Sequence, residues 1–244
     1  MKPSPRRRLD QLLVERGLAD SRAKAQALVL AGEVTVEGQK AAKPGHPVQE
    51  DARIEVASPP RFVGRGGLKL EAALAHFGID VHGRVCADIG ASTGGFTDCL
   101  LQHGAAHVYA VDVGSGQLDW KLRGDPRVLL REGVNARYLG AEHIGEPLDF
   151  AACDVSFISA TLILPALVAL LKPSGEMVIL IKPQFEAGRG QVGKGGIVRD
   201  PAVHTQACDR VREAVEELGF GTSVIESPIL GAEGNKEFLL DARH

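Results

Sequence analysis

An apolar run that leads into a glycine-rich turn and then into a helical pattern defines the fold class of this chain. The run spans Val85–Gly90, Gly94 and Gly95 follow, and apolar spacing typical of a helix continues through Leu101. A strand, a glycine-rich turn and a helix form the opening unit of a doubly wound sheet, in which ligands lie at the carboxyl ends of the strands. The sequence therefore predicts an α/β domain with a ligand site beside Gly90.

A carboxylate at the end of the next apolar run indicates the kind of ligand. The run His107–Asp112 ends in an acid that is placed to accept the two hydroxyls of a cofactor ribose. Such a site serves nicotinamide dinucleotides as well as S-adenosylmethionine, and a tight turn without a ligand is a third reading. The loop lacks the Gly-x-Gly-x-x-Gly spacing that admits a pyrophosphate, and Asp88 would place a negative charge nearby. Both observations favour S-adenosylmethionine, which carries a sulfonium and an amino group.

Further apolar runs extend the same sheet. The run 148–154 ends in Asp154, and the continuous run 177–183, typical of a parallel strand buried on both faces, carries Lys182 near its end. The stretch Phe157–Leu171 reads as a buried core helix, too short to span a bilayer. The other predicted elements are helices over 68–77 and 200–218 and strands over 222–226 and 237–240.

Charge is distributed unevenly along the 244 residues, although the formal net charge is only −3. Residues 1–65 hold 12 Lys and Arg against 8 Asp and Glu, whereas residues 66–244 hold 16 against 23. A basic module of this size is typical of a protein that binds nucleic acid, and a solvated charged surface is the alternative.

The basic module alternates helical and strand patterns between Leu9 and Val56. Leucines at helical spacing lead to a stop at Gly17, Ser21 is a natural N-cap for a second helix, and alternating runs predict strands. Two short helices and a small sheet are expected. Basic residues on the polar positions of the helices (Arg8, Arg22 and Lys24) and just before them (Arg6 and Arg7) form a face suited to phosphates.

The module resembles the S4-type RNA-binding domain, which makes RNA the expected partner. The similarity rests on motifs in the family's order: Arg8-Leu9-Asp10, Ser21-Arg22, Val34 and Val36 with Gly38, Lys43-Pro44, and Asp51 with Ile54. The Pro- and Gly-rich stretch that follows reads as a boundary. The predicted organisation is an S4-type domain over 1–58, a linker over 59–67 and a second domain over 68–244.

Four charged residues of the second domain, each of which alone would read as a solvated surface charge, resemble a known catalytic set. Lys69, Asp154, Lys182 and Glu237 match the Lys-Asp-Lys-Glu tetrad of FtsJ-like ribose methyltransferases in order and in local sequence: Gly66-Gly67-Leu68-Lys69, Asp154-Val155-Ser156-Phe157, Lys182-Pro183-Gln184-Phe185 and Asn235-Lys236-Glu237. The implied fold is a Rossmann-like, mostly parallel sheet of seven strands.

With both domains included, nearly the whole chain resembles the TlyA family, also labelled hemolysin A. The resemblance implies S-adenosylmethionine-dependent 2'-O-methylation of ribosomal RNA or ribosomal subunits, at cytidine. It also implies that Asn135 lies near the cofactor adenosine. The expected cofactor-binding residues are Asp88, Gly90, Ser92, Thr93, Gly94, Gly95, Phe96, Asp112, Asn135 and Asp154.

A ribose hydroxyl needs help to lose its proton during methyl transfer. Lys182, if partly desolvated and close to another cation, would accept that proton or stabilise the developing alkoxide. Asp154 would orient Lys182 and the methyl donor, while Lys69 and Glu237 would position the hydroxyl.

Other readings stay open on the sequence alone. Amino methylation commonly uses an Asn or Asp-Pro-Pro-aromatic motif, and cytosine carbon methylation a Pro-Cys nucleophile, neither of which is seen near Asp154 or Cys153. An RNA-binding protein without catalytic activity and a membrane-lysing protein are the alternatives from other classes. Four scattered cysteines, no secretory signal and no membrane span favour a cytoplasmic protein without a metal site. No protein partner can be inferred.

Overall fold

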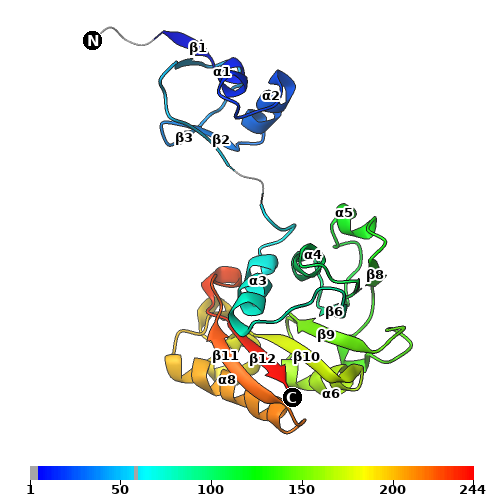
Figure 1. Ribbon diagram of the computed structural model, residues 1–244. Helices are drawn as coiled ribbons and strands as arrows, with labels where there is room; N and C mark the ends of the chain where they lie inside the picture. The colour runs from blue at the N-terminus through cyan, green and yellow to red at the C-terminus, as the bar shows by residue number, and fades with distance from the viewer. Residues whose placement is uncertain (1–4, 58–59) are drawn as a thin grey trace. The chain divides into compact units, whose positions relative to one another are not determined.

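The chain forms two compact units, residues 1–60 and 61–244, and the computed structural model describes residues 5–57 and 60–244 (Figure 1). Ser58 and Pro59, at the predicted end of the first domain, lie outside the described residues. Residues 61–67, which the sequence places in a linker, lie in the second unit. Phe62 is buried against Gly67 there, and the backbone N–H of Val63 donates to the Asp98 carboxylate over 2.8 Å.

Two short helices and five short strands make up the described part of the first unit. Leucines at helical spacing are buried in the first helix, and Ser21 caps the second by accepting a hydrogen bond from the backbone N–H of Lys24 over 3.2 Å. Both features confirm the predicted pattern. The elements are β1 (Arg6–Arg8), α1 (Leu9–Glu15), α2 (Arg22–Leu30), β2 (Val34–Val36), β3 (Gln39–Lys40), β4 (Pro47–Gln49) and β5 (Ile54–Val56).

The strands of the first unit pair into two antiparallel sheets rather than the single small sheet predicted. β1 pairs with β4, and β2 lies between β3 and β5. Arg8 is a second correction, because its backbone is extended and it ends β1 instead of lying on a helix. Residues 1–60 contain no Phe, Trp or Tyr, so aliphatic side chains such as Leu9, Leu13 and Val34 build this core.

A seven-stranded sheet forms the centre of the second unit. Its strands are β6 (Val85–Ile89), β7 (His107–Val111), β8 (Val128–Arg131), β9 (Leu148–Cys153), β10 (Leu171–Ile181), β11 (Gly221–Glu226) and β12 (Phe238–Arg243). The order is β11–β12–β10–β9–β6–β7–β8, in which β12 runs antiparallel to both neighbours and the other pairs are parallel. The predicted mostly parallel sheet of seven strands is confirmed.

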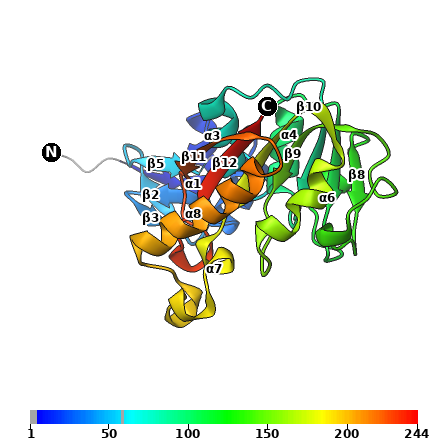
Figure 2. The same ribbon diagram turned by 90° about the horizontal axis from the view of Figure 1, so that it is seen from below.

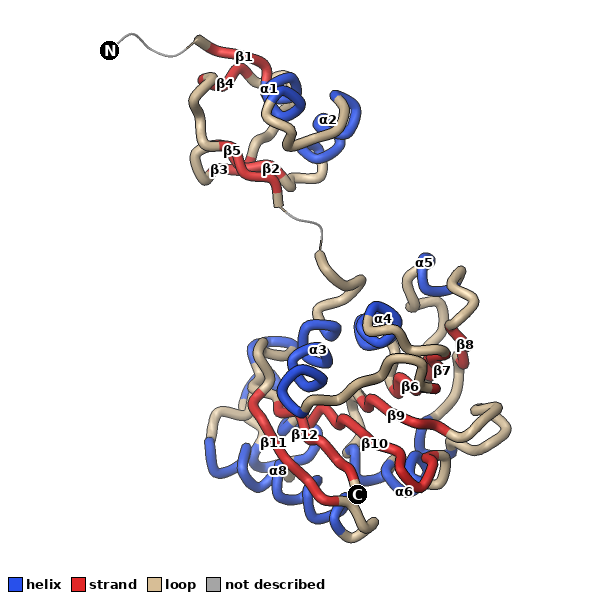
Figure 3. The backbone as a smooth tube through the Cα atoms, in the orientation of Figure 1, coloured by secondary structure: helices blue, strands red, loops and turns tan. Residues whose placement is uncertain are grey.

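Helices cover both faces of this sheet (Figures 1 and 3). α3 and α4 pack on one face with one apolar cluster, and α6 and α8 pack on the other with a second cluster, in front of the sheet in Figure 2. The helices are α3 (Gly66–Phe77), α4 (Gly95–Gln102), α5 (Trp120–Arg123), α6 (Leu164–Val168), α7 (Pro183–Glu186) and α8 (Pro201–Glu216), with 3-10 turns η1 (Ala136–Tyr138), η2 (Ala160–Leu162), η3 (Arg189–Gln191), η4 (Lys194–Gly196) and η5 (Ala232–Gly234).

The stretch Phe157–Leu171 is not the single buried helix that its apolar composition predicts. It contains η2 and the five-residue α6, and Leu171 already begins β10. Phe157 has a φ of +66° and is 92% exposed. A positive φ at a bulky residue ends helical geometry, and Pro165 is tolerated only in the first turn, where it lies in α6.

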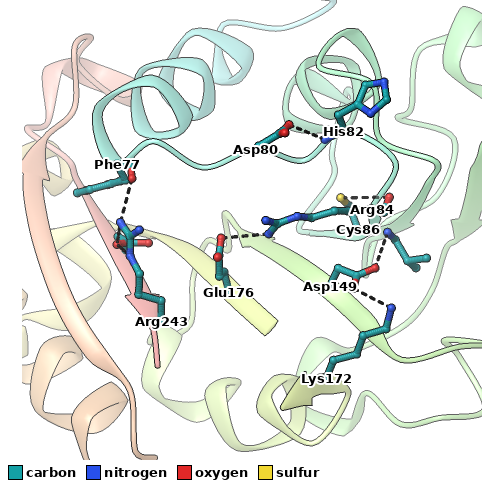
Figure 4. A network of polar contacts seen from close by, with 11 residues as sticks. Phe77, Asp80, His82, Arg84, Cys86, Asp149, Lys172, Glu176 and Arg243 are labelled. Carbon is teal, nitrogen blue, oxygen red and sulfur yellow. Dashed lines mark hydrogen bonds and ion pairs between the residues drawn. The ribbon is translucent and has the colours of Figure 1, made fainter. Parts of the chain in front are cut away.

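A polar network closes the amino edge of the sheet, away from the carboxyl strand ends (Figure 4). Asp149 accepts hydrogen bonds from the backbone N–H of Val85 over 3.0 Å and from Lys172 over 2.7 Å, and Arg84 pairs with Glu176 at 3.1 Å. These contacts join the starts of β6 and β9 to Lys172 and Glu176 of β10, so they help to fix the relative register of the strands that carry the site.

Candidate active site

The three central strands end level with one another. Ile89 of β6 is paired with Val111 of β7 on one side and with Cys153 of β9 on the other. Because neighbouring parallel strands in register end together, the next residues of each strand emerge side by side at the carboxyl edge. Two cavities, of about 440 and 230 Å³, lie there and share Gly90, Ser92 and Asp154 in their walls.

The larger cavity is lined by the loops after β7 and β9. Asp112 accepts hydrogen bonds from the backbone N–H groups of Ser92 and Gly114, each over 2.7 Å, which ties the loop after β6 to the loop after β7. Asn135 also lines this cavity, and its side-chain oxygen accepts from the backbone of Arg137 over 3.0 Å. Five of the predicted cofactor residues therefore share one wall: Gly90, Ser92, Asp112, Asn135 and Asp154.

Gly90 is where the glycine-rich loop touches the end of β9. Its φ is +89°, and a Cβ atom at this position would lie 2.2 Å from the backbone oxygen of Asp154. Any larger residue would push the two strand ends apart. The position therefore requires glycine for two reasons: its φ is positive, and the Asp154 oxygen leaves no room for a Cβ atom.

The rest of the glycine-rich loop divides into lining and packing residues. Thr93, Gly95 and Phe96 line the smaller cavity, as Asp88 does. Gly94 lines neither cavity. It caps α4 with a φ of +97°, and a Cβ there would lie 2.3 Å from a methyl group of Leu122, so its role is packing.

Asp88 is a buried carboxylate in the wall of the smaller cavity. Its Oδ2 accepts hydrogen bonds from the backbone N–H and the hydroxyl of Thr97, over 2.8 and 2.7 Å. No donor among the described residues reaches its Oδ1. Burial raises the pKa of Asp88 to about 7, although the Thr97 hydrogen bonds act in the opposite direction. An unpartnered oxygen on a buried acid suits a cationic ligand group.

The four residues of the predicted tetrad come together as two lysine–carboxylate pairs. The Nζ atom of Lys182 lies 2.5 Å from Oδ1 of Asp154, and that of Lys69 lies 2.5 Å from Oε2 of Glu237. Lys69 and Glu237 are buried, and Lys69 and Asp154 line the smaller cavity. The described contacts give Lys182 an anion as its close charged neighbour, not the second cation that the sequence suggests.

Several residues of the site are missed by sequence reasoning. Ser156 accepts a hydrogen bond from Nζ of Lys182 over 2.8 Å. Gly231 lines the smaller cavity, and a Cβ there would overlap the Glu237 carboxylate. Ser156 could have been found from its place two residues after Asp154, whereas Gly231 carries no signal of its own.

The exposed Phe157 and the half-buried Phe185 form an aromatic pair beside the larger cavity. Phe157, which lines it, lies 5.2 Å from Phe185 between ring centroids. Glu186 fixes the loop after Phe157. This buried acid accepts hydrogen bonds from the backbone N–H of Ala160 over 2.8 Å and from the hydroxyl of Ser159 over 2.5 Å. The ring of Phe157 is therefore presented to solvent by a loop that Glu186 holds in place.

In the first unit, the predicted RNA-binding residues are exposed but differ in their ion pairs. Arg8 and Arg22 both contact Asp10, each at 3.0 Å. Arg7 contacts Glu15 at 2.7 Å and Glu50 at 2.5 Å. Arg6 and Lys24 are exposed, and the described residues include no ion-pair partner for either.

Two further observations concern metals and membranes. The described residues contain no group of three His, Cys, Asp or Glu side chains that could hold a metal ion. None of the described helices is long and apolar enough to cross a membrane.

A mostly parallel sheet of seven strands, a glycine-rich loop after β6 and an acid after β7 define an S-adenosylmethionine-dependent methyltransferase. The family model of FtsJ-like methyltransferases matches residues 62–244, and that of the S4 domain matches residues 7–54. The chain belongs to the FtsJ-like methyltransferase family, in the branch that carries an N-terminal S4 domain. Its cofactor is S-adenosylmethionine.

Several relatives match across both domains. A Mycobacterium tuberculosis protein named 16S/23S rRNA (cytidine-2'-O)-methyltransferase TlyA is 48% identical over 96% of this chain and 89% of its own length. Hemolysin A of Brachyspira hyodysenteriae is 45% identical over 95% of this chain and 98% of its own. A solved structure from Streptococcus thermophilus, described as a candidate hemolysin, is 45% identical with a TM-score of 0.74 and covers 98% of this chain and 89% of its own.

Proposed function

We propose that the chain transfers a methyl group from S-adenosylmethionine to a ribose 2'-hydroxyl of ribosomal RNA, at a cytidine. The observation that carries this proposal is the pair of lysine–carboxylate contacts, Lys182–Asp154 and Lys69–Glu237, beside the cofactor loop. The names of the relatives support ribosomal RNA as the substrate class and cytidine as the nucleoside.

The two cavities fit the two halves of the cofactor. In the larger one, Asp112 would accept the ribose hydroxyls of the adenosine and Asn135 would lie beside its base. In the smaller one, the free Oδ1 of Asp88 would accept the cofactor's ammonium group, with Gly90, Thr93, Gly95 and Phe96 around the methionine part. Ser92 and Asp154 would lie between the halves, because both residues line both cavities. When bound, S-adenosylmethionine supplies an electrophilic methyl group.

Lys182 and Asp154 would act on the acceptor hydroxyl. Its oxygen must lose a proton as the new C–O bond forms, and negative charge on oxygen is costly in a partly buried site. The N–H groups of Lys182 would stabilise that oxygen while its proton passes to solvent, or Nζ in its neutral form would take the proton. Asp154 and Ser156 would hold the lysine in place. Lys69 and Glu237 would position the ribose from the other side of the smaller cavity. Orientation would supply much of the rate gain.

The geometry argues against methyl acceptors that need other groups. Carbon methylation of cytosine requires a thiolate nucleophile, but burial raises the pKa of Cys153 to about 12. Its place inside β9 is that of an apolar core residue. The loop after β9 is Asp-Val-Ser-Phe rather than the Pro-Pro-aromatic motif of amino methylation.

The S4-type unit would recruit the RNA. Its exposed basic residues, Arg6, Arg7, Arg8, Arg22 and Lys24, offer phosphate contacts, and the proposal places the protein with ribosomes in the cytoplasm.

The test is transfer of labelled methyl from S-adenosylmethionine to ribosomal subunits that lack the modification, followed by nuclease digestion. We expect a 2'-O-methylcytidine that is made by the intact protein and reduced about 10²- to 10⁴-fold by Lys182→Ala, the range general acid–base groups supply. Cofactor binding by calorimetry should be unchanged in that variant. Cofactor binding without transfer to either subunit or to whole ribosomes would favour an RNA-binding protein without activity, and liposome leakage by Lys182→Ala would favour membrane lysis.

A further inference from the structure

One carboxylate of the first unit lies among its basic residues without any exposed surface. Asp10, the second residue of α1, accepts four side-chain hydrogen bonds, all of 3.0 Å. Arg8 donates two of them, one to each oxygen, while Arg22 and Gln26 donate to Oδ2. Arg8 comes from β1, and Arg22 and Gln26 come from α2, so Asp10 joins three elements.

The contacts leave most of each guanidinium group free. A guanidinium has five N–H donors in a rigid plane, of which Arg8 uses two on Asp10 and Arg22 uses one. Within residues 5–57 and 60–244, no other hydrogen-bond or ion-pair partner is found for either side chain. Both remain about half exposed, at 46% and 53%. Two half-exposed guanidinium groups therefore share one buried anchor, and that of Arg8 also lies against Gly45.

Arg7 shows the opposite arrangement. It is held by two partly exposed acids, Glu15 and Glu50, so its local cluster carries a net charge of −1. The cluster of Asp10 with Arg8 and Arg22 carries +1. Adjacent arginines of the same strand thus differ in what they can offer to an anion, which sequence position alone does not show.

We propose that Asp10 is a positioning residue, which orients the guanidinium groups of Arg8 and Arg22 toward neighbouring phosphates of a structured RNA. This inference rests on the proposed function, since it takes ribosomal RNA as the ligand. The fork of Arg8 lowers the pKa of Asp10, so the anchor stays ionised at neutral pH. Orientation in advance reduces the conformational entropy that long arginine side chains lose on binding.

The sign of one substitution separates positioning from plain electrostatics. Asp10→Asn removes a negative charge from an RNA-binding surface, so electrostatics alone predicts tighter binding. Positioning predicts weaker binding, because an amide cannot hold the Arg8 fork through both oxygens. Glu15→Gln is the matched control, since it removes an exposed negative charge from the same helix and breaks one of the two ion pairs of Arg7.

The experiment measures the affinity of the full-length variants for unmodified 16S and 23S ribosomal RNA transcripts over a range of salt concentrations. We expect Asp10→Asn to weaken RNA binding about tenfold. The slope of log affinity against log salt concentration should become shallower, by the equivalent of about one to two phosphate contacts. Glu15→Gln should leave RNA binding as tight as in the wild type or tighter. In a chain that already carries Arg8→Gln and Arg22→Gln, Asp10→Asn should no longer weaken binding. Far-ultraviolet circular dichroism of each variant checks that the first unit stays folded, because the same arginine contacts also join the elements of this unit.

Arg8→Lys covers the case in which Asp10→Asn unfolds the first unit. Lysine keeps the charge but cannot form the planar two-point contact, so binding should weaken although the net charge is unchanged. Transcript binding by Asp10→Asn and Arg8→Lys as tight as that of the wild type overturns the inference and leaves the proposed function intact. Failure of the wild type to bind either transcript overturns the inference, whereas methyl transfer to ribosomal subunits decides the proposed function.

Discussion

At the scale of single residues, Asp88 makes the most direct link between a physical property and cofactor binding. Its unpartnered oxygen must be ionised to hold an ammonium group, and its pKa of about 7 means that a proton occupies it below neutrality. Cofactor affinity should therefore weaken as the pH falls from 8 to 6, by up to about tenfold per pH unit below the pKa. Calorimetric titration with S-adenosylmethionine at each pH measures this.

Asp88→Asn should separate binding from stability. The variant should bind the cofactor more weakly at pH 8 and lose the pH dependence, while Thr97 can still donate to the amide oxygen. Between about pH 4 and 7, Asp88 carries a proton in the folded wild type but not in the unfolded chain. The free energy of unfolding of the wild type therefore decreases as the pH rises through this range. Without cofactor, the variant should have a higher Tm at pH 8. A lower Tm would show that the ionised carboxylate stabilises the fold.

Sequence alone predicted the charged and glycine residues of the site because many of them lie at or just after the end of a strand. Asp112 and Asp154 end apolar runs, and the parallel register then brings them to one edge. The ion pairs between these side chains could not be predicted. Lys69 and Glu237 are distant in the chain, and nothing in their spacing indicates a contact. Ser156 carries only one signal in the sequence, its place two residues after Asp154.

At the scale of elements, the loop between β6 and α4 depends on the absence of a side chain at one point. Gly90→Ala should abolish measurable cofactor binding, because its Cβ would displace the end of β9 and Asp154 with it. Gly83→Ala is the matched control: it also has a positive φ, of +70°, but no atom lies within 4 Å of its Cβ. We expect the control to lose only about 1 kcal/mol of stability and to keep its affinity. Equal losses in both variants would contradict this account.

Phe157, in the loop after β9, should act on the acceptor, whereas Asp154 at the start of that loop would contact the cofactor. Phe157→Ala removes the exposed aromatic face at the mouth of the larger cavity, where a nucleobase could stack. We expect transfer to ribosomal subunits to fall about tenfold or more, in line with the roughly 1–3 kcal/mol of one stacked base, with little change in cofactor affinity. Phe185→Leu, which alters the neighbouring ring, should have a smaller effect on transfer.

Most elements of the second unit were predictable, and the largest failure has a physical reason. Strands β6, β7 and β9 were found because buried parallel strands are short, continuous apolar runs. The run Phe157–Leu171 has the same composition, but its apolar residues serve a loop, a short helix and the start of a strand in turn. Composition cannot distinguish these uses, because the φ of Phe157 is set by the surrounding loops.

At the scale of the whole molecule, the second unit should bind the cofactor and the first unit should contribute to RNA binding. Removal of residues 1–60 should leave cofactor affinity unchanged, because the residues that line both cavities belong to the second unit. Affinity for ribosomal RNA should fall. The slope of its logarithm against the logarithm of salt concentration should become shallower by about 0.9 for each phosphate that the first unit neutralises in the intact protein. An unchanged slope would show that the second unit alone binds the phosphates.

The two-unit organisation was visible in the sequence as a change of charge and a Pro- and Gly-rich segment. The end of the first unit near Pro60 agrees with the position of that segment. The packing of residues 61–67 was not visible, because Phe62 and Val63 are only two apolar residues among prolines, glycines and arginines. Only the shape of α3 and α4 shows where its ring lies.

The lack of aromatic residues in the first unit means that this unit contributes no intrinsic fluorescence. The single tryptophan, Trp120, and both tyrosines lie in the second unit. Intrinsic fluorescence therefore follows the unfolding of the methyltransferase unit alone, whereas far-ultraviolet circular dichroism follows the helices and strands of both. Whenever the two units melt at different temperatures, the two signals will separate, and the difference between them isolates the melting of the S4-type unit without any label.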